Sequence, residues 1–406
     1  MPGIRDRAPG ALRAADGTGI GSGQPNVAGR VPPPVPRDRG SAVRSGDPRL
    51  AQLVHPAGGA QPGPGPLSGR GECPSGAGCT DGSAFGNDGS ERAAAGPHFD
   101  APVPRRGYAW WYIDALSDDG QHSLTVIAFI GSVFSPYYAW ARRRGGGDPY
   151  RHLAVNVALT GPRGRWGNNR WAMTERGAPS LTIEQTTLGI GPSWLSWDGN
   201  GLTVRLQEWC APVPRRIDGF IRLYPRAIAS HSHALDASGR HRWSPLAPLA
   251  RVEVALDNPA LRWSGEGYFD HNAGDAPLEE DFSHWHWSRG ATSDGATVLY
   301  DTTRRDGSTF SWAGHYSGAG TMAFNPPGLV SLPPTRWRLA RATRAEAGDA
   351  HVARTLLDAP FYARSLVHTK LMGQNLAMMH ESLSLDRFSM TLVQTMLPFR
   401  TPRAVW

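Results

Sequence analysis

Hydrophobic and polar residues alternate in short runs from about residue 107 to the end of the chain, with turn sequences between them. The first run is aromatic (residues 107–114, GYAWWYID). The turn sequence SDDG at 117–120 follows it, and then an apolar run begins at residues 124–130 (LTVIAFI). Two such runs around a short Asp/Gly turn are typical of a β-hairpin.

Four further runs of the same kind come next, and no long helical period interrupts them. They lie at residues 153–159, 181–184, 202–206 and 219–223. Short strands at steady spacing, rich in Trp, Thr and Val, indicate an all-β barrel or sandwich.

The second half of the chain repeats the opening hairpin pattern. Trp110 and Trp285 are separated by 175 residues (285 − 110), and the Asp-Gly turns at 119 and 294 have the same offset (294 − 119 = 175). An apolar run follows each turn. We therefore predict two tandem β-domains, at residues 99–258 and 259–406.

The first 98 residues have a different composition, with much Gly, Pro, Ala and Arg and hardly an aromatic residue. Such a segment cannot bury enough apolar surface to offset the loss of chain entropy on folding. We predict a disordered extension at residues 1–98 and leave it out of the fold.

The net charge of the chain and the length of its apolar runs indicate which partners it can bind. The net charge is +7, nearly all from arginine, and no basic stripe of the kind that binds nucleic acid is present. The longest apolar run, residues 124–134, is about half of what a membrane-spanning helix requires. A basic surface favours an anionic membrane face, so we predict peripheral membrane contact and no nucleic acid.

Three cysteines form neither a disulfide framework nor a zinc set, and no apolar secretory signal opens the chain. The expected location is therefore cytoplasmic. Neither a strand-borne serine elbow nor a phosphate-binding loop is present.

The sequence most like a reaction site is SGEGYFDHN, at residues 264–272. In an extended strand, Glu266, Tyr268 and Asp270 point to one face, and Phe269 and His271 point to the other. A carboxyl group beside an aromatic ring on an inward face suggests acid chemistry on an apolar compound. The simpler alternative is a β-hairpin with a buried Tyr and a turn Asp.

A second segment, RHRW at 240–243, places His241 and Trp243 on one face in the same way. If the two segments faced each other, a carboxyl group, an imidazole and two aromatic rings would share one cavity. That set suits a cationic reaction, with a proton donor, π-faces for a carbocation and a base for water. The His-x-His pairs at 231/233 and 284/286 could instead hold a metal, but neither has a cysteine nearby, and we predict no metal site.

Three motifs together resemble the carotenoid 1,2-hydratase family of purple photosynthetic bacteria, also called hydroxyneurosporene synthases. They are residues 107–120 (GYAWWYIDALSDDG), 265–272 (GEGYFDHN) and 380–388 (HESLSLDRF). The resemblance covers the chain from about residue 107 to its end. It implies lipocalin-like β-barrels and a hydro-lyase, free of cofactors, that adds water to the terminal C1–C2 double bond of neurosporene or lycopene.

The family's functional residues match His241, Trp243, Tyr268 and Asp270 here. We expect Asp270 to protonate the alkene, with Glu266 as the next candidate, and the two rings to stabilise the tertiary cation. His241 would activate water or tune Asp270. The alternative function is a lipocalin-like carrier that binds a carotenoid or lipid without reaction. The expected location is the cytoplasmic side of the inner or photosynthetic membrane.

Overall fold

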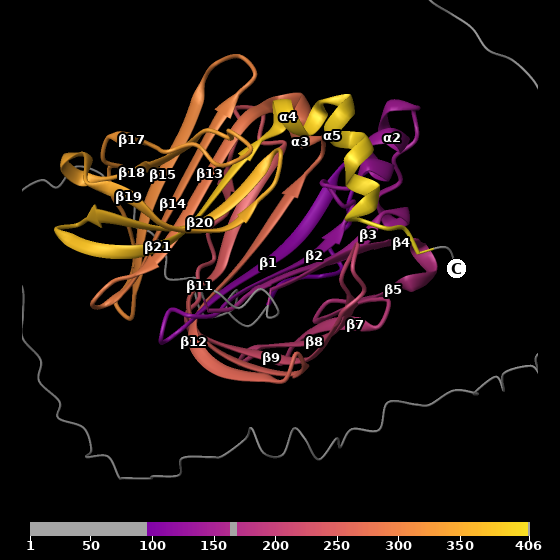
Figure 1. Cartoon of the computed structure of the whole chain (residues 1–406), viewed down its shortest axis with the longest axis horizontal. Coiled ribbons are helices and arrows are strands. Elements are labelled where there is room, and N and C mark those ends of the chain that lie inside the picture. Colours follow the sequence, from indigo (N-terminus) through magenta and orange to yellow (C-terminus); the bar gives the residue numbers. More distant parts are fainter. Residues whose placement is uncertain (1–95, 163–168, 405–406) are drawn as a thin grey trace, which may run out of the picture. The chain divides into compact units, whose positions relative to one another are not determined.

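Two antiparallel sheets contain most of the strands in the computed structural model, which describes residues 96–162 and 169–404 (Figure 1). The strands of the first sheet are β1 (Tyr108–Ser117), β2 (Ser123–Ile130), β3 (Leu153–Thr160), β4 (Arg170–Arg176), β5 (Leu181–Glu184), β6 (Thr187–Ile190), β7 (Ser193–Trp197), β8 (Leu202–Trp209), β9 (Arg216–Ala227), β10 (His233–Ala234), β11 (His241–Asn258) and β12 (Leu261–Gly274).

The second sheet contains seven strands of the described chain, and a small separate pair lies outside both sheets. The seven are β13 (Phe282–Ala291), β14 (Gly295–Arg304), β15 (Thr309–Ser317), β16 (Gly320–Ala323), β19 (Ala350–Asp358), β20 (Tyr362–Leu371) and β21 (Gln374–Ser384). The pair is β17 (Leu329–Leu332) and β18 (Arg341–Arg344). The predicted all-β class is confirmed, and so is each predicted strand run.

Short helices lie at the chain connections. They are α2 (Pro136–Arg143), α3 (Leu278–Asp281), α4 (Leu385–Ser389) and α5 (Thr391–Met396). Helix α2 begins where the Ser135 hydroxyl accepts hydrogen bonds from the backbone N–H groups of Tyr137 and Tyr138, with proline at the first helical position. Figure 1 shows α4 and α5 close to one end of both sheets.

Strand β1 is buried on both faces, which explains its continuous aromatic and apolar sequence. Trp111 and Ile113 point into a core that the curled first sheet encloses. Trp110 and Tyr112 point the other way, into a core shared with the second sheet. The first sheet therefore curls around one core and packs against the second sheet through the other.

Both sheets have the same strand order around their first strand. In the first sheet the order is β4-β3-β2-β1-β12-β11-β9, and in the second it is β16-β15-β14-β13-β21-β20-β19. The two hairpins that share the 175-residue offset, β1-β2 and β13-β14, occupy equivalent places. This order is what a duplicated β-unit would produce.

Equivalent residues of the two hairpins also contact each other. The ring centroids of Trp110 and Trp285 lie 6.3 Å apart, and those of Tyr112 and Trp287 lie 5.2 Å apart. Contact between equivalent positions is typical of units related by an approximate two-fold axis.

The predicted boundary at 258/259 lies ahead of β12, which pairs with β1 and β11 in the first sheet. The change from one sheet to the other comes between β12 and β13. The division into two separate domains stays a prediction. The predicted extension lies outside the described residues except for 96–98, where the Pro97 carbonyl accepts a hydrogen bond from the Trp111 indole.

A buried ion-pair network joins the two sheets. Asp114 of β1 is fully buried and pairs with Arg289 of β13 (Nε to Oδ2, 2.5 Å) and with Arg364 of β20. Arg364 also pairs with Glu381 of β21 (Nη1 to Oε1, 2.5 Å). Arg289 is 4% exposed, and this burial lowers its pKa to about 10.

We expect Asp114→Asn to lower the free energy of unfolding by about 3–5 kcal/mol, because it leaves buried guanidinium groups without their shared anion. Urea unfolding followed by tryptophan fluorescence measures the change. The control is Asp118→Asn, which removes an exposed pair with Arg251 and should cost at most about 1 kcal/mol. Equal losses for the two variants would contradict the importance of the buried network.

Candidate functional site

The four predicted site residues lie on two neighbouring strands. His241 and Trp243 are on β11, and Tyr268 and Asp270 are on β12. These strands are antiparallel, and Trp243 lies opposite Asn272 in the register. The predicted alternation along β12 is confirmed, since Tyr268 belongs to the core between the sheets and Phe269 to the core of the curled sheet.

Three of the four residues form one hydrogen-bonded cluster. The Oδ2 atom of Asp270 accepts hydrogen bonds from the Tyr268 hydroxyl (2.7 Å) and from the Trp243 indole Nε1 (2.9 Å). Its Oδ1 atom accepts one from the Asn272 amide at 3.0 Å. The Tyr300 hydroxyl of the second sheet donates in turn to Asn272 Oδ1 at 3.0 Å.

Burial changes the acidity of this carboxyl group. It raises the pKa of Asp270 from 3.8 to about 7, because the charged form loses its hydration. The hydrogen bonds from Tyr268, Trp243 and Asn272 lower the pKa by less, and the nearby charge of Glu381 raises it further. The surroundings of Asp270 therefore favour the protonated acid far more than water does.

His241 shares the buried face of β11 with Trp243, as predicted, but it does not contact Asp270 directly. Its ring is fully buried, with Nδ1 at 2.9 Å from the Tyr108 hydroxyl and Nε2 at 2.6 Å from Asp281 Oδ2. Both ring nitrogens thus have partners other than Asp270. The structure brings Trp243, Tyr268 and Asp270 together, and it places His241 at the edge of that cluster.

Aromatic rings from the second sheet surround the cluster. Trp243 contacts Tyr300 and Trp312, with ring centroids 4.5 and 5.1 Å away. Tyr268 contacts Trp287, with ring centroids 5.0 Å apart. Sequence reasoning did not select these residues of the second sheet; its one related observation was the 175-residue offset between Trp110 and Trp285.

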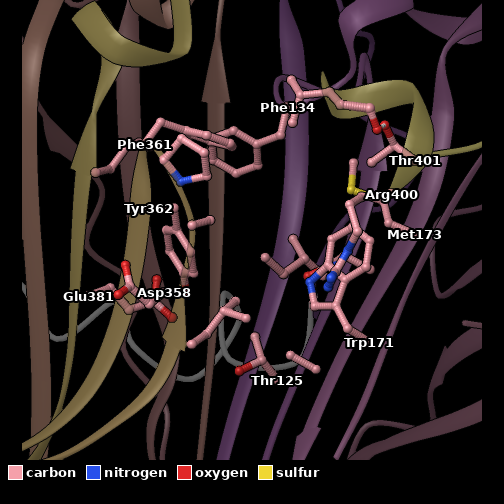
Figure 2. Close-up of a pocket in the computed structure, with 18 of the residues that line it drawn as sticks. Thr125, Phe134, Trp171, Met173, Asp358, Phe361, Tyr362, Glu381, Arg400 and Thr401 are labelled. Carbon is pink, nitrogen blue, oxygen red and sulfur yellow. Dashed lines mark hydrogen bonds between the residues drawn. The ribbon is translucent and has the colours of Figure 1, made fainter. Parts of the chain in front are cut away.

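A cavity of about 400 Å³ lies beside this cluster and has the size of a small-molecule site (Figure 2). Most of its lining is apolar or aromatic. The described residues that line it are Trp110, Tyr112, Thr125, Ile127, Phe134, Asn156, Ala158, Trp171, Met173, Leu278, Trp285, Trp337, Leu357, Asp358, Ala359, Pro360, Phe361, Tyr362, Glu381, Leu383, Val393, Met396, Leu397, Arg400 and Thr401.

None of the four predicted residues is part of this lining. Tyr112 connects the cavity with the cluster, because it lines the cavity and its ring lies edge-on to Tyr268, at 6.1 Å between centroids. The Tyr112 hydroxyl donates to Glu381 Oε1 at 2.7 Å. Glu381 belongs to the 380–388 motif, but sequence reasoning did not select it as a site residue.

The His-x-His pairs have other surroundings. His233 stacks on Trp243, with 5.1 Å between ring centroids, and His286 Nδ1 lies 3.1 Å from the Ser382 hydroxyl. Within residues 96–162 and 169–404, no group of three or more His, Cys, Asp or Glu side chains is arranged to hold a metal ion. No helix in the same part of the chain is long and apolar enough to cross a bilayer.

Comparison with known proteins gives concordant results. The family model "Carotenoid hydratase CrtC" matches residues 126–406. The chain is 51% identical to the acyclic carotenoid 1,2-hydratase of Thiocapsa roseopersicina over 97% of each chain. It is 46% identical to the enzyme of the same name from Rubrivivax gelatinosus over 76% of each chain.

A solved structure shares the fold. It is a putative AttH protein from Nitrosomonas europaea, which aligns with a TM-score of 0.50 and 14% identity over 69% of this chain and 92% of the other. The lipocalin-like architecture expected from the sequence is thereby confirmed. On the evidence of the family model and the two relatives, the chain belongs to the carotenoid hydratase family, whose members are hydro-lyases.

Proposed function

We propose that this protein adds water to the terminal C1–C2 double bond of acyclic carotenoids such as neurosporene and lycopene, by acid catalysis and without a cofactor. The observation that carries the proposal is a protonatable carboxyl group, Asp270, buried among aromatic rings beside an apolar cavity. The cavity suits one end of a hydrocarbon chain, and the acid suits an alkene, which is a poor base.

The first chemical step is proton transfer from Asp270 to C2, which leaves a tertiary cation at C1. The raised pKa of Asp270 keeps the proton available near neutral pH. The ring faces of Trp243 and Tyr268 stabilise the cation, by about 2 kcal/mol each at most when water is excluded. Since about 1.4 kcal/mol is a factor of ten in rate, each ring contributes tens-fold.

Access to Asp270 requires a local change. Asp270 is 3% exposed and outside the cavity lining, whereas Tyr112 and Trp285 are in it. The proposal therefore requires the terminal isoprene unit to turn one of these rings aside. His241, with both nitrogens bound to Tyr108 and Asp281, would then position the end of β11 that carries Trp243.

The alternative is a carrier that binds a carotenoid or lipid in the same cavity without reaction. Burial of an ionisable group in a protein interior costs free energy unless it is compensated, and a carrier of a hydrocarbon gains nothing from it. Asp270, with three hydrogen-bond donors arranged around it, favours the enzyme.

Exposed apolar side chains near the cavity suit the entry of substrate from a membrane. Five exposed apolar side chains come from the two segments that carry the cavity-lining residues Trp337 and Met396, and we call them together the rim patch: Trp337, Met390, Leu392, Met396 and Phe399. Leu392 and Phe399 are 67% and 73% exposed.

The rim patch adjoins the cavity, because Trp337 and Met396 belong to both. The exposed Arg336, Arg338 and Arg400 lie next to it in the chain. Apolar side chains with arginines beside them suit the surface of an anionic bilayer, which attracts each nearby arginine by about 1 kcal/mol. We propose peripheral membrane contact through this patch, and location on the cytoplasmic side stays a prediction.

We expect the rate constant kcat/KM to fall as pH rises through about 7, since Asp270 then loses the proton that it donates. The pKa of Asp270 is higher in the folded protein (about 7) than in the unfolded chain (3.8). Its protonated form therefore stabilises the fold fully below pH 3.8, and this contribution to the free energy of unfolding is lost as pH rises through about 7. An infrared difference spectrum between the wild type and Asp270→Asn should show a protonated carboxyl band that titrates there. A band already absent at pH 5 would argue against Asp270 as the acid.

Turnover of lycopene in deuterated water should place one deuterium at C2 of the hydrated product. We expect Asp270→Asn to lower hydration by at least about 100-fold, the usual size of general acid catalysis, with the fold retained by circular dichroism. The matched control is Glu266→Gln, on the same face of β12. Loss of hydration in the control and not in Asp270→Asn would transfer the acid role to Glu266.

We expect Leu392→Ser with Phe399→Ser to weaken binding to vesicles of anionic phospholipid by tenfold or more, because burial of each side chain contributes about 1.5–3 kcal/mol. Co-sedimentation with the vesicles measures this. Turnover of detergent-dispersed lycopene should not change. Met322→Ser, which alters a side chain on β16 that is 55% exposed, is the control. Equal binding by all three proteins would place membrane contact elsewhere.

A further inference from the structure

Glu381 is one of two carboxyl-bearing residues among the described residues that line the cavity, the other being Asp358. It lies on β21, opposite Trp287 of β13 and Arg364 of β20 in the register. Its side chain is 16% exposed. Figure 2 shows Glu381 and Asp358 on one wall of the cavity, with Trp171 on the other side.

The partners of Glu381 hold its carboxyl group in a fixed position. The Tyr112 hydroxyl and the Arg364 guanidinium both donate to Oε1, at 2.7 and 2.5 Å. Glu381 also contributes to the raised pKa of the neighbouring Tyr362 hydroxyl, after burial as the main cause. A carboxylate accepts about four hydrogen bonds through its two oxygens, so Glu381 has capacity left for a water molecule in the cavity.

Glu381 is also close to the acid. Its charge acts on the pKa of Asp270, and the Tyr112 ring that binds it packs against Tyr268. Its register partner Trp287 contacts both tyrosines. Glu381, from the second sheet, therefore lines the cavity on the side where Tyr112 separates it from Asp270 of the first sheet.

The other candidates for a base are less well placed. His241 is outside the cavity lining, and both of its nitrogens have partners. Asp358 lines the same wall of the cavity as Glu381 (Figure 2), with Oδ2 bound to the Arg336 backbone N–H and Oδ1 buried without a hydrogen-bond partner among the described residues. Of the two carboxyl groups, Glu381 is the one whose charge adds to burial in raising the pKa of Asp270. A base that removes a proton from attacking water must lie within hydrogen-bond reach of the water.

We propose that Glu381 is the general base of the hydration, a role that rests on the proposed function. After Asp270 has given its proton to C2, the oxygen of a water molecule forms a bond to the C1 cation. One O–H bond of that water breaks, and its proton goes to the Glu381 carboxylate. Asp270 is then an anion and Glu381 is neutral, and exchange of protons with solvent restores both.

This division of roles predicts that cation formation and water capture can be separated. In Glu381→Gln the alkene is still protonated, but the cation returns a proton from C2 to Asp270 and is not captured. Incubation with lycopene in deuterated water should lower hydration by about 100-fold. At the same time, deuterium should accumulate in the recovered lycopene, as mass spectrometry would show. Asp270→Asn should show neither hydration nor exchange.

Two controls accompany this experiment. Glu253→Gln makes the same change in a carboxyl group that also accepts a hydrogen bond from a tyrosine hydroxyl, that of Tyr224 at 3.2 Å. Glu253 is not part of the cavity lining, so this variant should hydrate lycopene like the wild type. Asp358→Asn tests the other carboxylate of the cavity. Deuterium exchange without hydration in Asp358→Asn, and not in Glu381→Gln, would overturn the proposal in favour of Asp358.

Other outcomes also decide the matter. Hydration by Glu381→Gln within threefold of the wild type, or loss of both hydration and exchange in that variant, overturns the base role. If Glu381→Gln does not fold, Glu381→Asp keeps the charge beside Arg364 and should raise the ratio of exchange to hydration above the wild-type ratio. An unchanged ratio overturns the proposal. Absence of hydrated product from the wild type contradicts the proposed function itself, before any variant is compared.

Discussion

The buried ion pairs of Asp114 with Arg289 and Arg364 determine how the two sheets meet. Charges removed from water are tolerated only where each has a partner, so the sheets can pack in few other registers. Asp114 and Arg289 are 175 residues apart, the same offset that relates the two hairpins. The contact between equivalent strands is therefore specified by complementary charges as well as by the stacked aromatic pairs beside them.

The same network reaches the cavity. Arg364 donates to Asp114 and to Glu381, and the Tyr112 hydroxyl joins it at Glu381. Tyr112 in turn packs against Tyr268, the partner of Asp270. The position of the candidate base thus depends on the interaction that fixes the sheets.

Local pattern was sufficient for part of the site and not for the rest. The period of two in β12 places Tyr268 and Asp270 on one face, and the same rule in β11 finds Trp243. It also selects His241, although two residues along a strand are about 7 Å, enough to give the imidazole other partners. Asn272 follows the same period of two on β12 but was not selected. Tyr300 and Glu381 come from the second sheet and depend on packing between sheets, which leaves no local signal in either strand.

The contrast between the two carboxyl groups follows from which sheet supplies each. The donors to Asp270 are neutral, an indole, a phenol and an amide, so burial decides its pKa and favours the protonated acid. Glu381 has a guanidinium partner, which suits a carboxylate. A hydration needs a proton donor and a proton acceptor at adjacent carbons, so the two carboxyl groups need environments that keep them in different protonation states. The first sheet supplies neutral donors around Asp270 and the second supplies Arg364 beside Glu381, so each sheet gives its carboxyl group a different environment.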